Sequence, residues 1–200
     1  MSGDAAAAFF VFALVAAVTP GPSNVLLTAA GANLGIVRGL FCLLGVSAGM
    51  AVMMLLMASG VAGVLLSEAA VLPAIKLVGA AFLLWLAWKI ASAGSGSPAA
   101  APKPQRFGFL DAAALQWVNP KAWVVSAGAA ATYLDPAPRS LALQALCFAA
   151  VFVSAALPSG FLWLAFGASL QKLLGDERRR RVFNIAMGLA LAASVAMILR

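Results

Sequence analysis

Charged and metal-binding side chains are scarce in this sequence of 200 residues. Lys, Arg, Asp and Glu make up 10% of it, whereas a soluble domain carries about 25%. Histidine is absent, and the two cysteines are Cys42 and Cys147. The low charge excludes a soluble enzyme. The absence of histidine and the presence of only two cysteines argue against a zinc site or a disulfide framework. We therefore expect neither a metal nor another cofactor.

Apolar residues fill the space that charges leave. They make up 64% of the sequence, against about 45–50% in a soluble domain, and disorder requires the opposite composition. Because one membrane span needs about 20 apolar residues, we predict an all-α membrane protein with six spans. They cover residues 5–33, 37–66, 69–93, 107–133, 140–171 and 180–199.

A polar linker divides the predicted membrane domain into two halves. Residues 94–106 read GSGSPAAAPKPQR, a composition typical of loops. The flanking halves, 1–93 and 107–200, carry three spans each. Because three is an odd number, the second half enters the membrane from the opposite side. If the halves share a fold, they form an inverted repeat.

Lysine and arginine are distributed unevenly between the loops. If the first, third and fifth loops are cytoplasmic, the other side holds only Arg139 and Arg200. The positive-inside rule then predicts that both termini lie outside. It also accounts for the net charge of +7 without a nucleic-acid partner. The nine cytoplasmic residues are Arg38, Lys89, Lys103, Arg106, Lys172 and Arg178–Arg181.

Two proline motifs interrupt apolar spans at corresponding positions of the halves. They are TPGPSN at 19–24 and NPK at 119–121. Proline removes a backbone donor, and irregular backbone at membrane depth is tolerated only inside protein or beside a water-filled cavity. We therefore expect the first and fourth helices to be broken. Thr19 and Asn119 are the predicted N-caps, each followed by proline at the first helical position.

Each break would begin a half-helix whose N-terminus attracts anions. Inverted halves bring the two N-termini to the midplane from opposite sides, which predicts a carboxylate site; the alternative is a pair of kinks that only shape the bundle. Lys121, buried near the centre of its span, would hold the carboxylate or bind a carbonyl freed by Pro120. The candidate substrate-binding residues are Thr19, Pro20, Gly21, Pro22, Asn24, Gln116, Asn119, Pro120 and Lys121.

Carboxylates and histidines are missing from the middle of the spans, so a proton relay of the usual kind is not visible. The candidates for coupling or gating are Lys76 in the third span and Asp111 at the start of the fourth. No cluster of ligands supports divalent-metal transport. A GxxxG pattern at 45–49 predicts close helix packing, either within the chain or between two copies in a homodimer.

The motifs resemble those of the LysE/RhtB family of amino-acid exporters. The similar segments are TPGPSN followed by GANLGIVRGL, the third-span IKLVGAAFLLWLAWK, and LQWVNPKAW. The resemblance implies export of amino acids across the bacterial inner membrane, driven by proton motive force. It adds Lys76 and Gly79 to the motif residues. Phe82 stands where the family often has tyrosine, which affects the choice of substrate.

Three functions remain open at this stage. The main hypothesis is a secondary transporter, and not an enzyme, that exports a small amino acid or related zwitterion by alternating access. A second hypothesis is a membrane thiol redox conduit that uses Cys42 and Cys147. A third is a membrane assembly protein that transports nothing, which would leave the paired breaks unexplained.

Overall fold

The computed structural model describes residues 3–60, 71–93, 108–171 and 173–198. Over these residues the chain is helical and contains no strand, in agreement with the all-α prediction. The predicted linker, 94–106, lies outside the described residues. The elements are α1 (Gly3–Val18), α2 (Pro22–Ala58), α4 (Val71–Ala91), α5 (Phe109–Val118), α6 (Pro120–Tyr133), α7 (Leu141–Ser169), α8 (Glu177–Ala193) and α9 (Val195–Ile198).

The long element α2 is a hairpin that reverses at Gly35. Gly35 has a φ of 76° and a ψ of −179°, a conformation essentially restricted to glycine. A Cβ on Gly31 would lie 2.1 Å from the Leu164 carbonyl, and one on Gly39 would lie 2.3 Å from Cδ1 of the same residue. Gly31 and Gly39 lie four residues before and four residues after Gly35, and both approach Leu164. The first arm (22–34) and the second arm (36–58) therefore run antiparallel.

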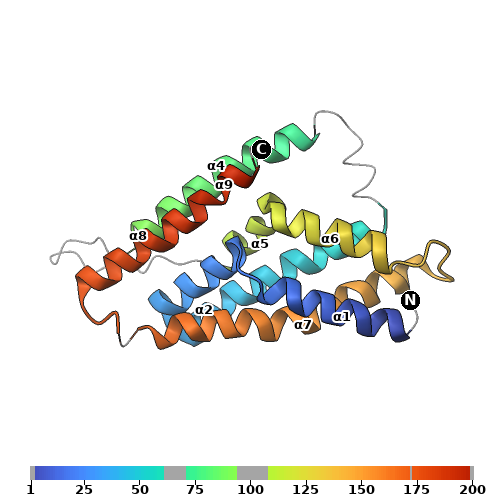
Figure 1. Cartoon of the computed structure of the whole chain (residues 1–200), viewed down its shortest axis with the longest axis horizontal. Helices are drawn as coiled ribbons and strands as arrows, with labels where there is room; N and C mark the ends of the chain where they lie inside the picture. Colours follow the sequence, from blue (N-terminus) through green and yellow to red (C-terminus); the bar gives the residue numbers. More distant parts are fainter. Residues whose placement is uncertain (1–2, 61–70, 94–107, 172, 199–200) are drawn as a thin grey trace.

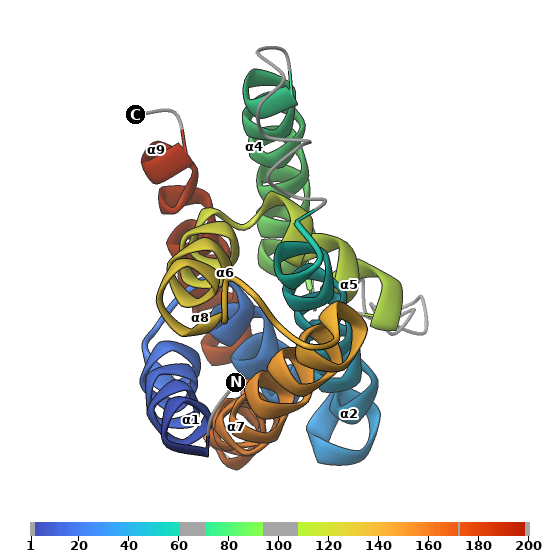
Figure 2. The same ribbon diagram turned by 90° about the vertical axis from the view of Figure 1, so that its right-hand side faces the viewer.

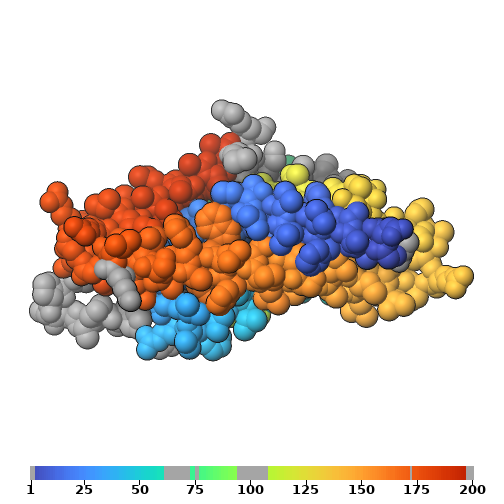
Figure 3. All heavy atoms as spheres, turned by 60° about the horizontal axis from the view of Figure 1, so that its bottom comes forward, coloured from blue at the N-terminus to red at the C-terminus, as the bar shows by residue number. Residues whose placement is uncertain are grey.

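Helix α7 is the support for the first half of the chain. Phe9 of α1 stacks on Phe148 with ring centroids 4.3 Å apart. Further along α7, Gly167 is so close to the first arm of α2 that a Cβ would lie 2.0 Å from the Thr28 carbonyl. Figure 3 shows α7 as a continuous band with α1 along one side. The gap between α1 and α2 therefore faces the middle of α7.

The second arm of α2 supports α5 in the same manner. A Cβ on Gly45 would lie 2.2 Å from the Phe109 carbonyl, and one on Gly49 would lie 2.7 Å from the Ala113 carbonyl. The predicted GxxxG packing is therefore found within the chain, where glycine allows two helix backbones to touch. Each half places its broken span along a long helix of the other half.

Helices α4, α8 and α9 form a separate oblique layer (Figures 1 and 2). Gly188 of α8 packs so closely on α4 that a Cβ would lie 2.7 Å from the Ala87 carbonyl. The layer meets α5 where Gly79 lies against Val118. A Cβ on Gly79 would lie 3.1 Å from the Cβ of Val118. This crossing lies directly beside the second proline motif.

Much of the outer surface along the described helices is apolar. By length and composition the second arm of α2 and helix α7 can each cross a membrane, and only 33% of the most apolar window of α7 is buried in the protein. Leu143, Leu146 and Leu162 of α7 are each about 60% exposed. Such a surface fits a hydrocarbon environment better than water.

Candidate functional site

The first proline motif separates α1 from α2, as predicted, but its cap differs from the prediction. The N-cap of α2 is Gly21, with an extended φ of −174° and no side-chain cap. Thr19 instead follows the last residue of α1, and its hydroxyl donates to the Val15 carbonyl at 2.7 Å. The prediction of Thr19 as N-cap is wrong because Pro22, and not Pro20, is the first helical residue. Pro20 and the extended Gly21 therefore separate Thr19 from the first residue of α2.

Side chains satisfy the carbonyls that the first break leaves without helical donors. The Asn24 amide donates to the carbonyls of Ala17 at 3.1 Å and Thr19 at 2.8 Å. The Trp163 indole donates to the Val18 carbonyl at 3.2 Å. A buried carbonyl without a partner is costly in an apolar medium. Asn24, predicted as a binding residue, therefore also holds the break in shape.

The second break follows the prediction closely. Asn119 is the N-cap of α6, and its side chain accepts from the Lys121 backbone N–H at 3.1 Å. Pro120 occupies the first helical position. The Trp123 indole donates to the Trp117 carbonyl at 2.7 Å, which satisfies a carbonyl at the end of α5.

A row of hydrogen bonds joins the two breaks. The Asn119 amide donates to the Ser23 hydroxyl at 3.1 Å, and this hydroxyl donates to Gln116 Oε1 at 3.0 Å. The Gln116 amide donates to the Ala112 carbonyl at 3.0 Å. Gln116 is 1% exposed and Asn119 is 3% exposed. The row thus fixes the start of α2 relative to α5 and α6.

Lys121 also bridges the breaks. Its ammonium donates to the Thr19 carbonyl, and its stem passes the N-cap glycine, where a Cβ on Gly21 would lie 2.8 Å from Lys121 Cδ. The carbonyl that Lys121 holds belongs to the opposite half of the chain. The expected partner of this kind, a carbonyl freed by Pro120, is not the one observed.

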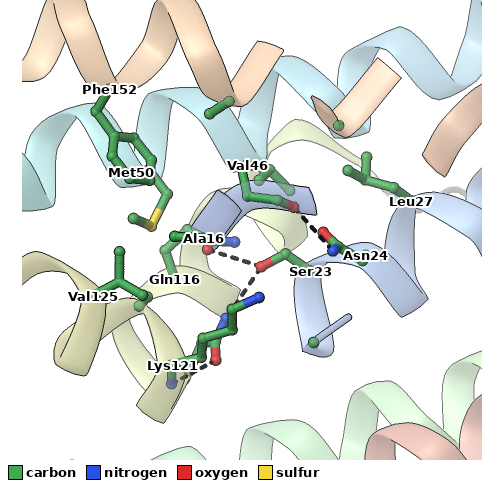
Figure 4. Close-up of a pocket in the computed structure, with 16 residues that line it drawn as sticks. Ala16, Ser23, Asn24, Leu27, Val46, Met50, Gln116, Lys121, Val125 and Phe152 are labelled. Carbon is green, nitrogen blue, oxygen red and sulfur yellow. Dashed lines mark hydrogen bonds between the residues drawn. The ribbon is translucent and has the colours of Figure 1, made fainter. Parts of the chain in front are cut away.

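These groups surround a cavity of about 60 Å³ (Figure 4). This volume has room for a few water molecules. Two helix N-termini, one ammonium and several amides meet there, a combination that can bind a carboxylate. Of the predicted residues, Thr19, Pro20, Pro22 and Pro120 form the breaks beside the cavity. Those that line it are Gly21, Asn24, Gln116, Asn119 and Lys121.

Sequence reasoning missed several lining residues. Ser23 lies within the TPGPSN motif, so its position beside Pro22 was an available signal. Met50, Val125 and Phe152 also line the cavity. Each is an apolar residue in an apolar span, and nothing in the local sequence distinguishes it from its neighbours.

Asp111, one of the two predicted coupling residues, lies apart from the cavity lining. Asp111 accepts from the Lys89 ammonium at 2.6 Å and from the Gly108 N–H at 3.2 Å. This ion pair ties the end of α4 to the start of α5. Lys76 lies in α4, but its side chain is outside the described part of the chain.

The two cysteines do not share a site. Cys42 is buried in the second arm of α2, and Cys147 is exposed on α7. Neither lines the cavity. In the described ranges, no group of three or more His, Cys, Asp or Glu side chains could hold a metal ion.

Comparison with known proteins identifies the family of this chain. The family model described as LysE type translocator matches residues 14–199. Two cysteine/O-acetylserine efflux proteins are similar: that of Salmonella typhimurium is 37% identical over 134 residues and that of Escherichia coli O9:H4 is 34% identical over 138. Each alignment covers 67% of this chain and 68% of the relative. No solved structure matches. The chain therefore belongs to the LysE family of membrane translocators, which are transporters and not enzymes.

Proposed function

We propose that the protein exports a small amino acid or related zwitterionic metabolite across the bacterial inner membrane. The observation that carries this proposal is the meeting of two helix breaks around one cavity, with Lys121 of one half on the Thr19 carbonyl of the other. The names of the relatives, cysteine/O-acetylserine efflux proteins, support a substrate of this size and charge.

The Lys121–Thr19 bond suits a zwitterion because it pairs a cation with a carbonyl acceptor. The substrate carboxylate accepts hydrogen bonds from the Lys121 ammonium. The substrate ammonium then donates to the Thr19 carbonyl in place of Lys121. Backbone N–H groups at the start of α6 already have acceptors, since Lys121 donates to the Asn119 side chain and Ala122 to the Asn119 carbonyl. Lys121 therefore supplies the principal contact with the carboxylate, assisted by the helix dipole.

Alternating access requires two bodies that move about the site. The packing of each broken span on a long helix of the other half supports an inverted repeat of three plus three spans. The uneven distribution of Lys and Arg between the loops supports placing both termini outside. The cavity of about 60 Å³ is small for an amino acid, so binding is accompanied by widening. Rocking of one half against the other provides this widening and exposes the site to either side.

Proton motive force is the proposed energy source. Among the described residues that line the cavity, Lys121 is the one charged side chain. The Asp111–Lys89 pair lies outside the lining, between the end of α4 and the start of α5. We assign Asp111 to gating, because breaking its ion pair would release α4 from α5.

The test is transport by purified protein in liposomes. Counterflow of labelled cysteine or O-acetylserine is measured for the natural sequence, for Lys121→Ala and for Arg139→Ala. Arg139 is an exposed cation of the same half and serves as the matched control. We expect Lys121→Ala to lose at least ten-fold in rate while Arg139→Ala keeps it. Full counterflow in a folded Lys121→Ala protein would contradict the proposed site.

The same assay also tests the thiol hypothesis, with a variant that lacks both cysteines. A Cys42→Ser, Cys147→Ser double variant should transport at the natural rate, because neither thiol reaches the cavity. Loss of counterflow in this variant, with Lys121→Ala unaffected, would favour the redox conduit instead.

A further inference from the structure

We propose that the cavity contains a side-chain subsite, formed by Met50, Val125 and Phe152, that accepts a short uncharged side chain and rejects cationic amino acids. This inference rests on the proposed function and specifies its substrate class. The three residues come from the second arm of α2, from α6 and from α7. All three line the same cavity as Lys121.

The subsite lies on one side of the polar row. In Figure 4 Met50, Phe152 and Val125 gather on one flank of Gln116 and Ser23, while Lys121 lies below them. Met50 is 6% exposed and Phe152 is 3% exposed. A substrate whose charged groups contact Lys121 and Thr19 therefore directs its side chain to this apolar wall.

Charge is the first basis for selection. Lys121 is the one charged group among the described residues of the lining, and those residues include no carboxylate. A lysine or ornithine substrate would bring a second ammonium into this mainly apolar pocket, whose described lining offers no acceptor of opposite charge. Burying an unpaired charge near a like charge is strongly unfavourable. Cationic amino acids should therefore be rejected even though they share the same carboxylate and α-ammonium.

Length is the second basis for selection. Phe152, Ala156 and Gly160 follow one another at intervals of four along α7, and all line the cavity. Residues at this spacing lie on one face of a helix, so Phe152 is the bulky end of a row that is otherwise small. Its ring also packs on Phe9, with centroids 6.4 Å apart. The phenyl group thus closes the subsite, and its removal should lengthen it.

The experiment is competition for counterflow of labelled O-acetylserine in liposomes. Unlabelled alanine, cysteine, methionine, leucine, lysine and ornithine are compared for the natural sequence. We expect the short neutral amino acids to compete at least ten-fold better than lysine and ornithine, and better than leucine. Equal competition by lysine would overturn the charge argument.

Variants of Phe152 test the length argument. Phe152→Ala should raise competition by leucine and methionine at least five-fold relative to alanine, and Phe152→Leu should do so less. The Leu variant covers the outcome that the Ala variant does not fold. Phe161→Ala is the matched control, because Phe161 lies on the same helix but is 41% exposed and outside the lining. An unchanged preference in a folded Phe152→Ala or Phe152→Leu protein would overturn the subsite.

A carboxylate added to the wall tests the charge argument directly. Met50→Glu should increase competition by lysine at least five-fold, whereas Met50→Gln should not. No gain in the folded Glu variant would overturn the proposal. Failure of the subsite is distinguishable from failure of the proposed function. In the first case counterflow persists and still depends on Lys121; in the second, no amino acid is transported or Lys121→Ala transports normally.

Discussion

Lys121 and Asn119 have different tasks at the second break. Lys121 reaches across to the Thr19 carbonyl, whereas Asn119 caps its own helix and donates to Ser23. Changes at the two positions should therefore separate binding from stability.

Replacing Asn119 tests the two functions of its side chain. Asn119→Ala should lose about 1 kcal/mol of unfolding free energy, since it removes an N-cap, together with most transport. Asn119→Ser restores a cap acceptor but is too short to replace the amide at Ser23. We expect thermal unfolding of the Ser variant to return toward the natural value while counterflow stays low. Equal recovery of both would show that the bond to Ser23 is dispensable.

Gly21→Ala tests whether the approach of Lys121 matters. The extended backbone at this residue accepts alanine, so the effect comes from the new Cβ, 2.8 Å from Lys121 Cδ. Since a lysine stem is flexible, stability should change by less than about 1 kcal/mol, but the rate of counterflow should fall several-fold. Gly128→Ala is the control, because that position has open space around it. An unchanged counterflow rate in Gly21→Ala would mean that the Lys121 side chain can adopt another position without loss of transport.

A few residues determine where individual helices begin, break and end, and the sequence alone identifies some of these residues. The broken spans were predicted from their prolines, because the loss of a donor is a local property. The cap at Gly21 was not, since it depends on which of two nearby prolines begins the helix. The apolar wall of Met50, Val125 and Phe152 was not predicted either. These residues come from three helices that meet only in the folded chain, and packing of this kind leaves no local signal.

The reversal at Gly35 provides a test at this level. Gly35→Ala places a Cβ in a conformation that only glycine readily adopts, at a cost of about 1–3 kcal/mol. We expect a lower unfolding temperature in detergent and a loss of transport in proportion to the unfolded fraction. Gly128→Ala, within the exposed face of α6, should not lower it. Unchanged stability of Gly35→Ala would indicate that the turn relaxes freely.

The described helices form two groups: α2 and α7 with the broken spans α1, α5 and α6 packed on them, and the layer of α4, α8 and α9 (Figure 1). A reciprocal amide pair joins this layer to the rest: Asn33 donates to Asn184 at 2.8 Å and receives a bond at 3.1 Å. Asn184, fully buried, also donates to the Ala93 carbonyl at 2.7 Å. The pair lies close to Gly35, where the hairpin turns.

A double-mutant cycle measures how firmly this layer is attached. Asn33→Ala and Asn184→Ala, alone and together, should give a coupling energy of about 0.6 kcal/mol, the average for hydrogen bonds between membrane helices. Thermal unfolding in detergent provides the free energies. A coupling of zero would mean that apolar contacts alone hold the layer in place.

The proposed topology can be tested by labelling from outside the cell. In a variant without Cys42 and Cys147, a cysteine at Ala137 should react with an impermeant maleimide in intact cells. A cysteine at Gly175 should react only after permeabilisation, because the two loops flank α7 on opposite sides. Both positions are exposed. The reverse pattern would place the termini inside.

The indole bonds at the two breaks have an optical consequence. Trp163 donates to Val18 at one break, and Trp123 donates to Trp117 at the other. Indole emission responds to hydrogen bonding and polarity, so each break contains its own fluorophore. Movement of either half-helix should therefore change the intrinsic tryptophan fluorescence. Substrate binding could then be followed by this fluorescence without an added dye.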